Sequence, residues 1–222
     1  MALRISLREA LKRVKAARTL ADIEALFMDA FGLSEAQILG AGKIEGLPDA
    51  DAPVELAEAA KMANPNYDNG GGYAENCQRC APAYELLRRG LKVMAQTNPY
   101  PNRSGTTKRF SMNGSECFIG AVIHGYRYDS AIPLERRNLI RALNLLPNGA
   151  RASIFWANPD GLKGHVVVCE KVNGQLVFID PQTGDIGNFV LGAAQKGRGY
   201  FWYRMDNLEL NPHFEWDEVV EQ

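Results

Sequence analysis

An Asn-Gly pair at residues 173–174, which separates two apolar runs, is the sequence feature that most constrains the fold. Val166–Val168 lies in the run before the pair, and Val177–Ile179 lies in the run after it. An Asn-Gly pair between apolar segments is the strongest short-range signal for a β-hairpin with a two-residue turn. The sequence therefore predicts two antiparallel strands, at 163–172 and 175–180.

The predicted turn also determines which residues face each other across the hairpin. Counting outward from Asn173-Gly174 pairs Val167 with Asp180 and His165 with Gln182. His165 and Asp180 then become diagonal neighbours on one face, with a backbone separation of roughly 7–8 Å that their side chains can span. We expect Asp180 to orient the His165 imidazole, as a carboxylate does in a catalytic triad, with Gln182 as a further polar group there.

Two cysteines, Cys77 and Cys80, lie at the expected start of a helix. A Gly-rich loop at 69–72 precedes them, Asn76 is the expected N-cap, and Gly90 is the expected stop. The first turn of a helix offers unpaired N–H groups and the positive end of the helix dipole, and both favour a thiolate over a thiol. We therefore expect a cysteine nucleophile here, with a histidine as its base.

The choice of cysteine and of histidine follows from different observations. Pro82 is tolerated best in a first turn, so it favours a helix start near Arg79 or Cys80 and thus favours Cys80 as the nucleophile. Among the three histidines, His165 is the candidate base because of its predicted hairpin partner. His124 and His213 are interpreted as structural residues, the more frequent role of a lone histidine.

Three ordered blocks of sequence carry a resemblance to a known family. They are Asn76-Cys77-Gln78-Arg79-Cys80 with the following Ala83–Gly90, then Gly164–Val167, then Asp180–Gly184. These blocks resemble the papain-fold toxin family, which includes bacterial glutamine deamidases, and the likeness covers about residues 64–204. Similar domains also occur in phage-associated proteins.

The resemblance implies a papain-like fold and a Cys-His-Asp triad, which falls on Cys77, His165 and Asp180. It favours Cys77 over Cys80, and a loose first turn before Pro82 would accommodate both observations. The implied chemistry is attack of a thiolate on a carboxamide, through a thioester, with the oxyanion stabilised by backbone N–H groups. Further candidates for oxyanion or substrate binding are Gln78, Gln182, Asn76 and Trp156, although a core aromatic is the alternative role of Trp156.

The family resemblance implies a bacterial toxin or effector that deamidates glutamine in a protein substrate. An immunity protein or delivery machinery are the further partners that it suggests. Two alternatives stay open, a cysteine protease of the same fold and an inactive, phage-associated binding module. The first differs only in the bond that is cleaved, so cleft shape decides between them.

Composition excludes other classes of function. The 222 residues carry a formal net charge of −1, so there is no basic excess for binding nucleic acid, and no apolar run reaches membrane-spanning length. The N-terminus lacks the apolar core of a signal peptide, so we expect synthesis in a bacterial cytoplasm and delivery by a dedicated secretion system. Cys77 and Cys80 have the spacing of zinc ligands or of a redox pair, but no second ligand pair exists and a Gly-rich loop replaces the strand expected before a redox motif. We expect no cofactor and no metal.

The chain is predicted to fold as α+β, with a central antiparallel sheet packed against the nucleophile helix. Helix-start patterns such as Ser6-Leu7-Arg8-Glu9 predict a helical region over residues 1–60, which would act as an adaptor, docking arm or lid. Residues 61–222 form the predicted papain-like catalytic domain. A polar segment at 97–114 is predicted as a surface loop near the substrate.

Overall fold

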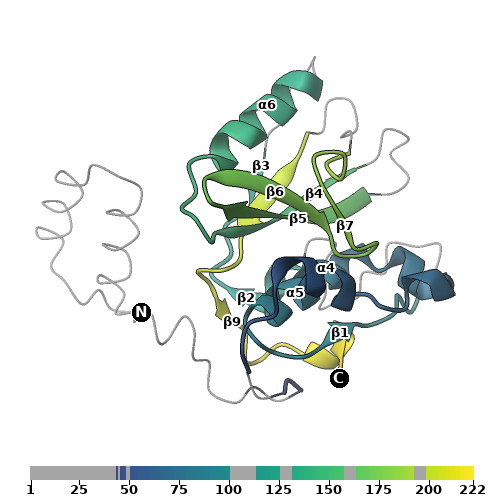
Figure 1. Ribbon diagram of the computed structural model, residues 1–222. Coiled ribbons are helices and arrows are strands. Elements are labelled where there is room, and N and C mark those ends of the chain that lie inside the picture. The colour runs from purple at the N-terminus through teal and green to yellow at the C-terminus, as the bar shows by residue number, and fades with distance from the viewer. Residues whose placement is uncertain are drawn as a thin grey trace, which may run out of the picture.

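The computed structural model describes residues 44, 46–48, 51–100, 114–125, 132–157, 164–192 and 199–222, with only the backbone for 132–135 (Figure 1). Its α-helices are α4 (Leu56–Met62), α5 (Cys77–Arg88) and α6 (Ile132–Leu143). Short 3₁₀ helices are η1 (Tyr67–Asn69), η2 (Gly71–Glu75), η3 (Ser115–Cys117) and η4 (Trp216–Glu218). The strands are β1 (Met94–Ala95), β2 (Phe118–Ile119), β3 (His124–Gly125), β4 (Arg151–Ala157), β5 (Gly164–Val172), β6 (Gln175–Asp180), β7 (Asp185–Ile186), β8 (Phe201–Arg204), β9 (Glu209–Leu210) and β10 (Val220–Glu221).

A sheet with the strand order β3-β8-β4-β5-β6-β7 forms the centre of the described structure. Every neighbouring pair in it is antiparallel. Two smaller antiparallel pairs, β1 with β10 and β2 with β9, lie outside this sheet. The expected α+β class with a central antiparallel sheet is confirmed.

Helices cover both faces of the sheet, with α6 on one side and α4 and α5 on the other (Figure 1). Successive residues of a strand point to opposite faces, and β5 shows this directly. Val166 and Val168 join the core that contains α4 and α5, whereas Val167 and Cys169 join the core beneath Leu139 of α6. The valine run is therefore buried on both faces.

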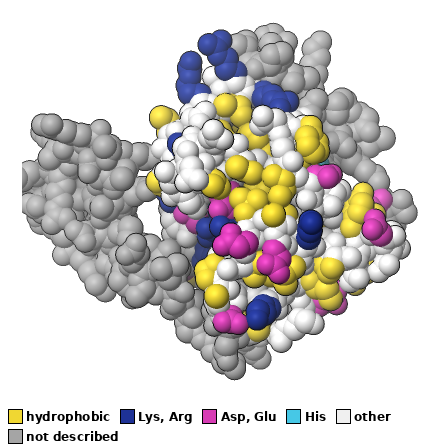
Figure 2. Space-filling model, viewed as in Figure 1, with side chains coloured by type: hydrophobic (Ala, Val, Ile, Leu, Met, Phe, Trp, Pro, Cys, Tyr) yellow, Lys and Arg dark blue, Asp and Glu magenta, His cyan; other side chains and the backbone are white. Residues whose placement is uncertain are grey.

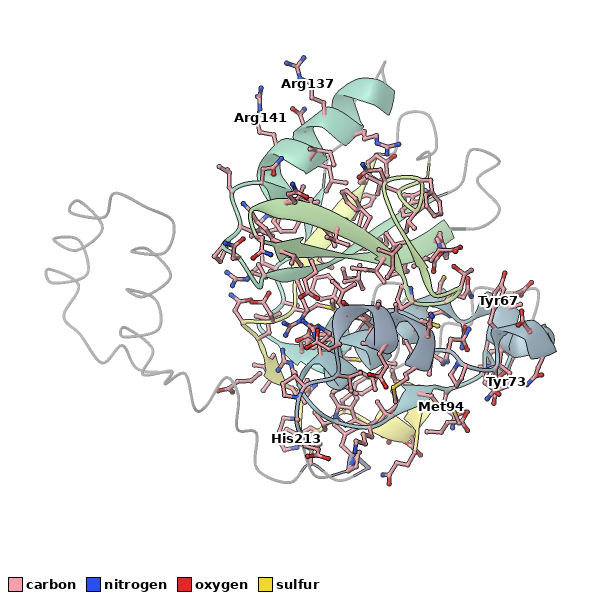
Figure 3. The ribbon with its side chains drawn as sticks, in the orientation of Figure 1. Tyr67, Tyr73, Met94, Arg137, Arg141 and His213 are labelled. Carbon is pink, nitrogen blue, oxygen red and sulfur yellow. The ribbon has the colours of Figure 1, made fainter. Side chains whose placement is uncertain are left out.

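The outer side of α6 is basic. Arg137 and Arg141 are exposed and point away from the sheet, as Figure 3 shows, and basic side chains gather at this end of the surface in Figure 2. Leu139 and Leu143 on the opposite side of α6 are fully buried. Helix α6 is therefore amphipathic, with its apolar side on the sheet and its basic side outward.

The β5–β6 hairpin has the predicted turn and register. Asn173 and Gly174 have φ angles of 49° and 80°, the left-handed values that a two-residue hairpin turn needs at both central positions. Val172 pairs with Gln175 and Val168 pairs with Ile179, as counting outward from the turn predicts. The open end of the hairpin, where His165 and Asp180 lie, is therefore set by the turn at its other end.

Helix α5 begins earlier than Pro82 suggests. The expectation of a start near Arg79 or Cys80 is wrong, because α5 starts at Cys77 and Pro82 lies in its second turn. The amide N–H groups of Arg79 and Cys80 both donate to the Asn76 carbonyl, at 2.8 and 3.2 Å, so the first turn combines 3₁₀ and α bonding. Asn76 occupies the N-cap position without a side-chain capping bond.

Gly90 ends α5 as the sequence predicts. The Leu91 N–H donates to the Leu86 carbonyl and the Gly90 N–H donates to the Leu87 carbonyl, which is a Schellman motif. Gly90 has a φ of +91°, and a Cβ atom there would lie 2.0 Å from the carbonyl oxygen of Asp51. Both the backbone angle and the close approach of this neighbouring segment require glycine.

Buried ion pairs hold α5 against the sheet. Glu85, which is completely buried, pairs with Arg151 of β4 at 2.6 Å and with Arg89 at 2.7 Å. A second carboxylate, Glu170 of β5, pairs with Arg88 at 2.8 Å and accepts a hydrogen bond from the Tyr84 hydroxyl at 2.8 Å. Each carboxylate thus ties the helix to a strand of the sheet.

Two of the predicted segments lie mostly outside the described residues. This applies to residues 1–43 of the predicted helical region and to 101–113 of the predicted surface loop. Helix α4 spans the predicted boundary at residue 60, and its Ala59 and Ala60 are buried in the same core as α5. The division into two domains stays a prediction. Within the described ranges, no helix is long and apolar enough to cross a bilayer.

Replacing Glu85 by Gln should lower the free energy of unfolding at neutral pH by about 3–5 kcal/mol, because the substitution leaves two buried guanidinium groups without their carboxylate. Burial raises the pKa of Glu85, but Arg151 and Arg89 outweigh it and bring that pKa below the ordinary value of 4.5. The stabilisation is therefore complete above pH 4.5 and is lost as the pH falls further.

Urea unfolding of wild type and Glu85→Gln over this pH range measures the difference. Lys92→Met is the matched control, because it breaks the Lys92–Asp51 pair, whose side chains are 65% and 67% exposed, and should cost at most about 1 kcal/mol. A cost for Glu85→Gln no larger than that of the control would contradict the role of the buried pairs.

Candidate active site

Cys77 and Cys80 have opposite environments at the start of α5. Cys77 is the first helical residue and is partly exposed, and its thiol lies 3.7 Å from the Gln78 side-chain oxygen. Cys80, one turn further, is completely buried and its thiol donates to Asn76 Oδ1 at 3.1 Å. Burial, followed by the nearby Cys77 and Asp180, raises the pKa of Cys80 well above its ordinary value, which disfavours its thiolate.

His165 and Asp180 meet at the open end of the β5–β6 hairpin. His165 Nε2 lies 2.6 Å from Asp180 Oδ2, and the two side chains are 23% and 12% exposed. The other carboxylate oxygen, Asp180 Oδ1, accepts a hydrogen bond from the Gln182 amide at 3.0 Å. The imidazole is therefore bound through one nitrogen to a carboxylate that the chain itself holds in place.

Cys77 and Asp180 together favour the imidazolium form of His165. Burial lowers the pKa of His165, but hydrogen bonds with Asp180 and with the Cys77 thiol outweigh it and raise that pKa to about 10. Since Nε2 faces Asp180, the second ring nitrogen is the one available to the thiol. The structure thus brings together a cysteine, a histidine and an aspartate, the three side-chain types of the expected triad.

Trp156 packs edge-on against the His165 ring. Their ring centres lie 5.5 Å apart at an interplanar angle of 86°, and Trp156 is only 4% exposed. A Cβ atom on Gly192 would lie 2.8 Å from the Trp156 ring, so the chain passes closely over it. Trp156 therefore restricts the movement of the imidazole, and very little of its own ring surface is exposed to a substrate.

The polar side chains that the sequence suggests for oxyanion binding, Gln78, Gln182 and Asn76, make different hydrogen bonds. Gln78 is buried beside the Cys77 thiol. Gln182 donates to Asn76 Oδ1 at a distance of 3.4 Å. Asn76 donates from its amide nitrogen to Asn64 Oδ1 at 3.2 Å and to the Gln96 carbonyl at 3.0 Å, which uses both of its hydrogens. Among these candidates, Gln78 lies nearest to the nucleophile.

Asn64 is a member of this cluster that motif reasoning did not identify. The segment 64–67 forms a turn, in which the Tyr67 N–H donates to the Asn64 carbonyl at 3.2 Å. The Asn64 side chain also contacts Asn76 and the Gln182 carbonyl, across 118 residues of sequence in the second case. No local sequence signal indicates such a contact.

The remaining histidines and cysteines lie apart from this cluster. His124 is at the edge of the sheet, stacked on Trp202 with ring centres 4.6 Å apart, and Figure 3 places His213 at the end of the molecule opposite α6. Cys117 and Cys169 are buried in the two cores. Over the described ranges, His, Cys, Asp and Glu side chains form no group of three or more with the geometry of a metal site.

Comparison with known proteins identifies one family. A family model described as papain fold toxin 1, glutamine deamidase, matches residues 75–185, which is half of the chain. The match begins just before Cys77 and ends just after the Asp180–Gly184 block, so it includes Cys77, His165 and Asp180 but not Asn64. Neither the curated proteins nor the solved structures provide a match.

Replacing Asp180 by Asn should lower the pKa of His165 from about 10 towards or below its usual 6.5, because the effect of burial then meets less opposition. NMR titration of the His165 ring in both proteins measures the change. The protonated pair stabilises the fold fully below pH 6.5, and this stabilisation disappears as the pH rises through about 10. An unchanged His165 titration in Asp180→Asn would contradict the pairing.

Proposed function

The chain belongs to the papain fold toxin 1, glutamine deamidase family, and on this premise we propose that it hydrolyses the carboxamide of glutamine side chains through a thioester on Cys77. The observation that carries the proposal is the contact of His165 with both Asp180 and Cys77, at the start of a helix within the matched region. Cys77 is preferred over Cys80 because Cys80 is buried and its thiolate is disfavoured.

In the first half of the reaction, the Cys77 thiolate attacks the carboxamide carbon and a C–S bond forms. The C–N bond then breaks, and the His165 imidazolium gives its proton to the departing nitrogen, so that ammonia leaves and an acyl-thioester remains. Asp180 holds the imidazole through Nε2 in both protonation states. The proton that His165 gives up in this half is the one that it takes from the Cys77 thiol.

In the second half, water attacks the thioester carbon. Neutral His165 takes a proton from that water, the C–S bond breaks, and glutamate is released. The thiolate and the imidazolium are restored, so no external acid, base or cofactor is consumed. The same histidine therefore acts as acid in one half and as base in the other.

The oxyanion of both tetrahedral intermediates is stabilised by the start of α5. The first N–H groups of a helix have no acceptor within the helix and point outward along its axis. Cys77 is the first residue of α5, so its own N–H is the backbone donor that we propose next to the reacting carbon. The Gln78 amide oxygen faces the Cys77 thiol, so the Gln78 side chain would contribute a donor only after its amide turns its NH₂ group towards the substrate.

The substrate that we propose is a protein rather than a free amide. The family description combines a toxin with a glutamine deamidase, which supports an effector that modifies a protein of a target cell. Under this proposal the chain is made in a bacterial cytoplasm, is delivered by a dedicated secretion system and is neutralised in its producer by an immunity protein. The protein substrate, the secretion system and the immunity protein are all part of what we propose.

Ammonia release from a blocked Gln-Gly peptide tests the chemistry without knowledge of the natural substrate. Wild type should release ammonia and leave the peptide bond intact. Cys77→Ala should show only background release, and His165→Ala should be slower by roughly 10²–10⁴-fold, because it lacks the general acid and base. Mass spectrometry of the peptide separates deamidation from cleavage.

Cys80→Ala is the matched control, since it removes the other cysteine of the motif and should keep the activity. Cleavage of the peptide bond instead of ammonia release would favour a protease. Loss of activity in Cys80→Ala but not in Cys77→Ala would move the nucleophile by one turn. Equal, slow iodoacetamide labelling of all cysteines in wild type would refute the enzyme and leave a binding module.

A further inference from the structure

Asn64 lies between the two elements that carry the reacting groups. It follows α4 directly, and its side chain is 5% exposed. Its Oδ1 accepts from Asn76 Nδ2 at 3.2 Å, and its Nδ2 donates to the carbonyls of Tyr73 and Gln182, both at 2.9 Å. One side chain therefore contacts the segment before α5, the N-cap of α5 and the turn after β6.

We propose that Asn64 is a positioning residue that sets the distance between Cys77 and the His165–Asp180 pair. The proposal rests on the function proposed above, because it concerns the alignment of that same triad. Asn64 touches neither the thiol nor the imidazole, and it acts through the residues adjacent to them.

On the nucleophile side, the connection passes through Asn76. Asn76 precedes Cys77 directly and is completely buried. Its carbonyl accepts the first two hydrogen bonds of α5, and its side-chain oxygen accepts from the Cys80 thiol. Holding the Asn76 side chain therefore holds the first turn of the helix, and with it the position of Cys77.

On the side of the His165–Asp180 pair, the connection passes through Gln182. The Gln182 carbonyl accepts from Asn64, and the Gln182 N–H donates to Asp180 Oδ1 at 3.0 Å. Since Asp180 Oδ2 binds His165, a shift of this turn moves the imidazole. The Gln182 side chain also donates to Asn76 Oδ1, so the two sides of the site are joined directly as well as through Asn64.

The chemistry of an asparagine side chain suits this place. It needs one acceptor for Asn76 and two donors for two carbonyls, and a primary amide supplies both at one end of a short side chain. A carboxylate of the same size would place negative charge against the carbonyls of Tyr73 and Gln182. An apolar residue would take away the Asn64 bond of the Tyr73 and Gln182 carbonyls and one of the two acceptors of Asn76 Nδ2.

The surrounding contacts keep Asn64 itself in place. The Ala95 N–H donates to the carbonyl of Ala63, the residue before Asn64, at 2.8 Å. The Tyr73 hydroxyl donates to Glu221 of β10 at 3.0 Å, and Figure 3 shows Tyr67, Tyr73 and Met94 at the same end of the molecule. Asn64 is thus a fixed point to which both sides of the site are attached.

The test is the rate of iodoacetamide alkylation at Cys77 as a function of pH, measured in the full chain by peptide mass spectrometry. Asn64→Ala should lower the rate constant at neutral pH by roughly 10–100-fold, because misplacement of a reacting group by about 1 Å costs up to that factor. Its rate should also follow pH like that of an ordinary thiol. Asn64→Ser, which keeps one hydroxyl at the site, should show a smaller change of the same kind.

Asn211→Ala is the matched control, since the Asn211 side chain also links two segments, through Glu116 and His213, and these hydrogen bonds do not involve Asn76, Gln182 or the triad. It should lower the melting temperature without changing the rate or the pH profile of Cys77. Folded Asn64 variants with the wild-type profile would overturn the positioning role, and so would a loss of folding in both Asn64 variants.

Wild type and His165→Ala in the same experiment report on the proposed function separately. Fast labelling of Cys77 in wild type that depends on His165 supports the triad, whatever Asn64 does. If wild-type Cys77 reacts as an ordinary thiol, the triad fails and the positioning proposal fails with it. If the triad is supported and the Asn64 variants match wild type, only the positioning proposal fails.

Discussion

The structure depends on how α5 is seated on the central sheet. Glu85 and Glu170 lie in the interface between them, where unpaired carboxylates would be very costly, and each is paired with arginine. These pairs determine both the position and the rotation of the helix on β4 and β5. The partial exposure of Cys77 and the burial of Cys80 follow from that rotation.

At the opposite end of α5, amide side chains hold the helix together with the buried Arg79 guanidinium, which donates to the Glu218 carbonyl at 2.8 Å. Asn64, Asn76 and Gln182 connect the helix start to the turn that carries Asp180. Neutral amides tie the two sides together without adding a charge beside the thiol and the imidazole, where a further carboxylate or guanidinium would alter the balance between thiolate and imidazolium. The helix is thus held by ion pairs along its length, and at its start the link to the turn that carries Asp180 is made by neutral amides.

Much of this arrangement could be predicted before the fold was known. The hairpin register, the proximity of His165 and Asp180, and the end of α5 at Gly90 all depend on residues close together in sequence. Pro82 misled the prediction of the helix start, because a buried helix tolerates one missing hydrogen bond when tertiary packing compensates for it. Asn64 was missed as a member of the site because one of its partners lies 118 residues away.

The sequence by itself determined which types of reactive side chain are present, the hairpin and the family. Turn geometry and helix ends are local properties of a few adjacent residues. Only the tertiary structure decided which cysteine faces the imidazole and which amides join the two sides of the site. Cys77 and Cys80 have the same chemistry and differ only in the direction that each takes from the helix. That direction is set by contacts between distant segments, which no local pattern contains.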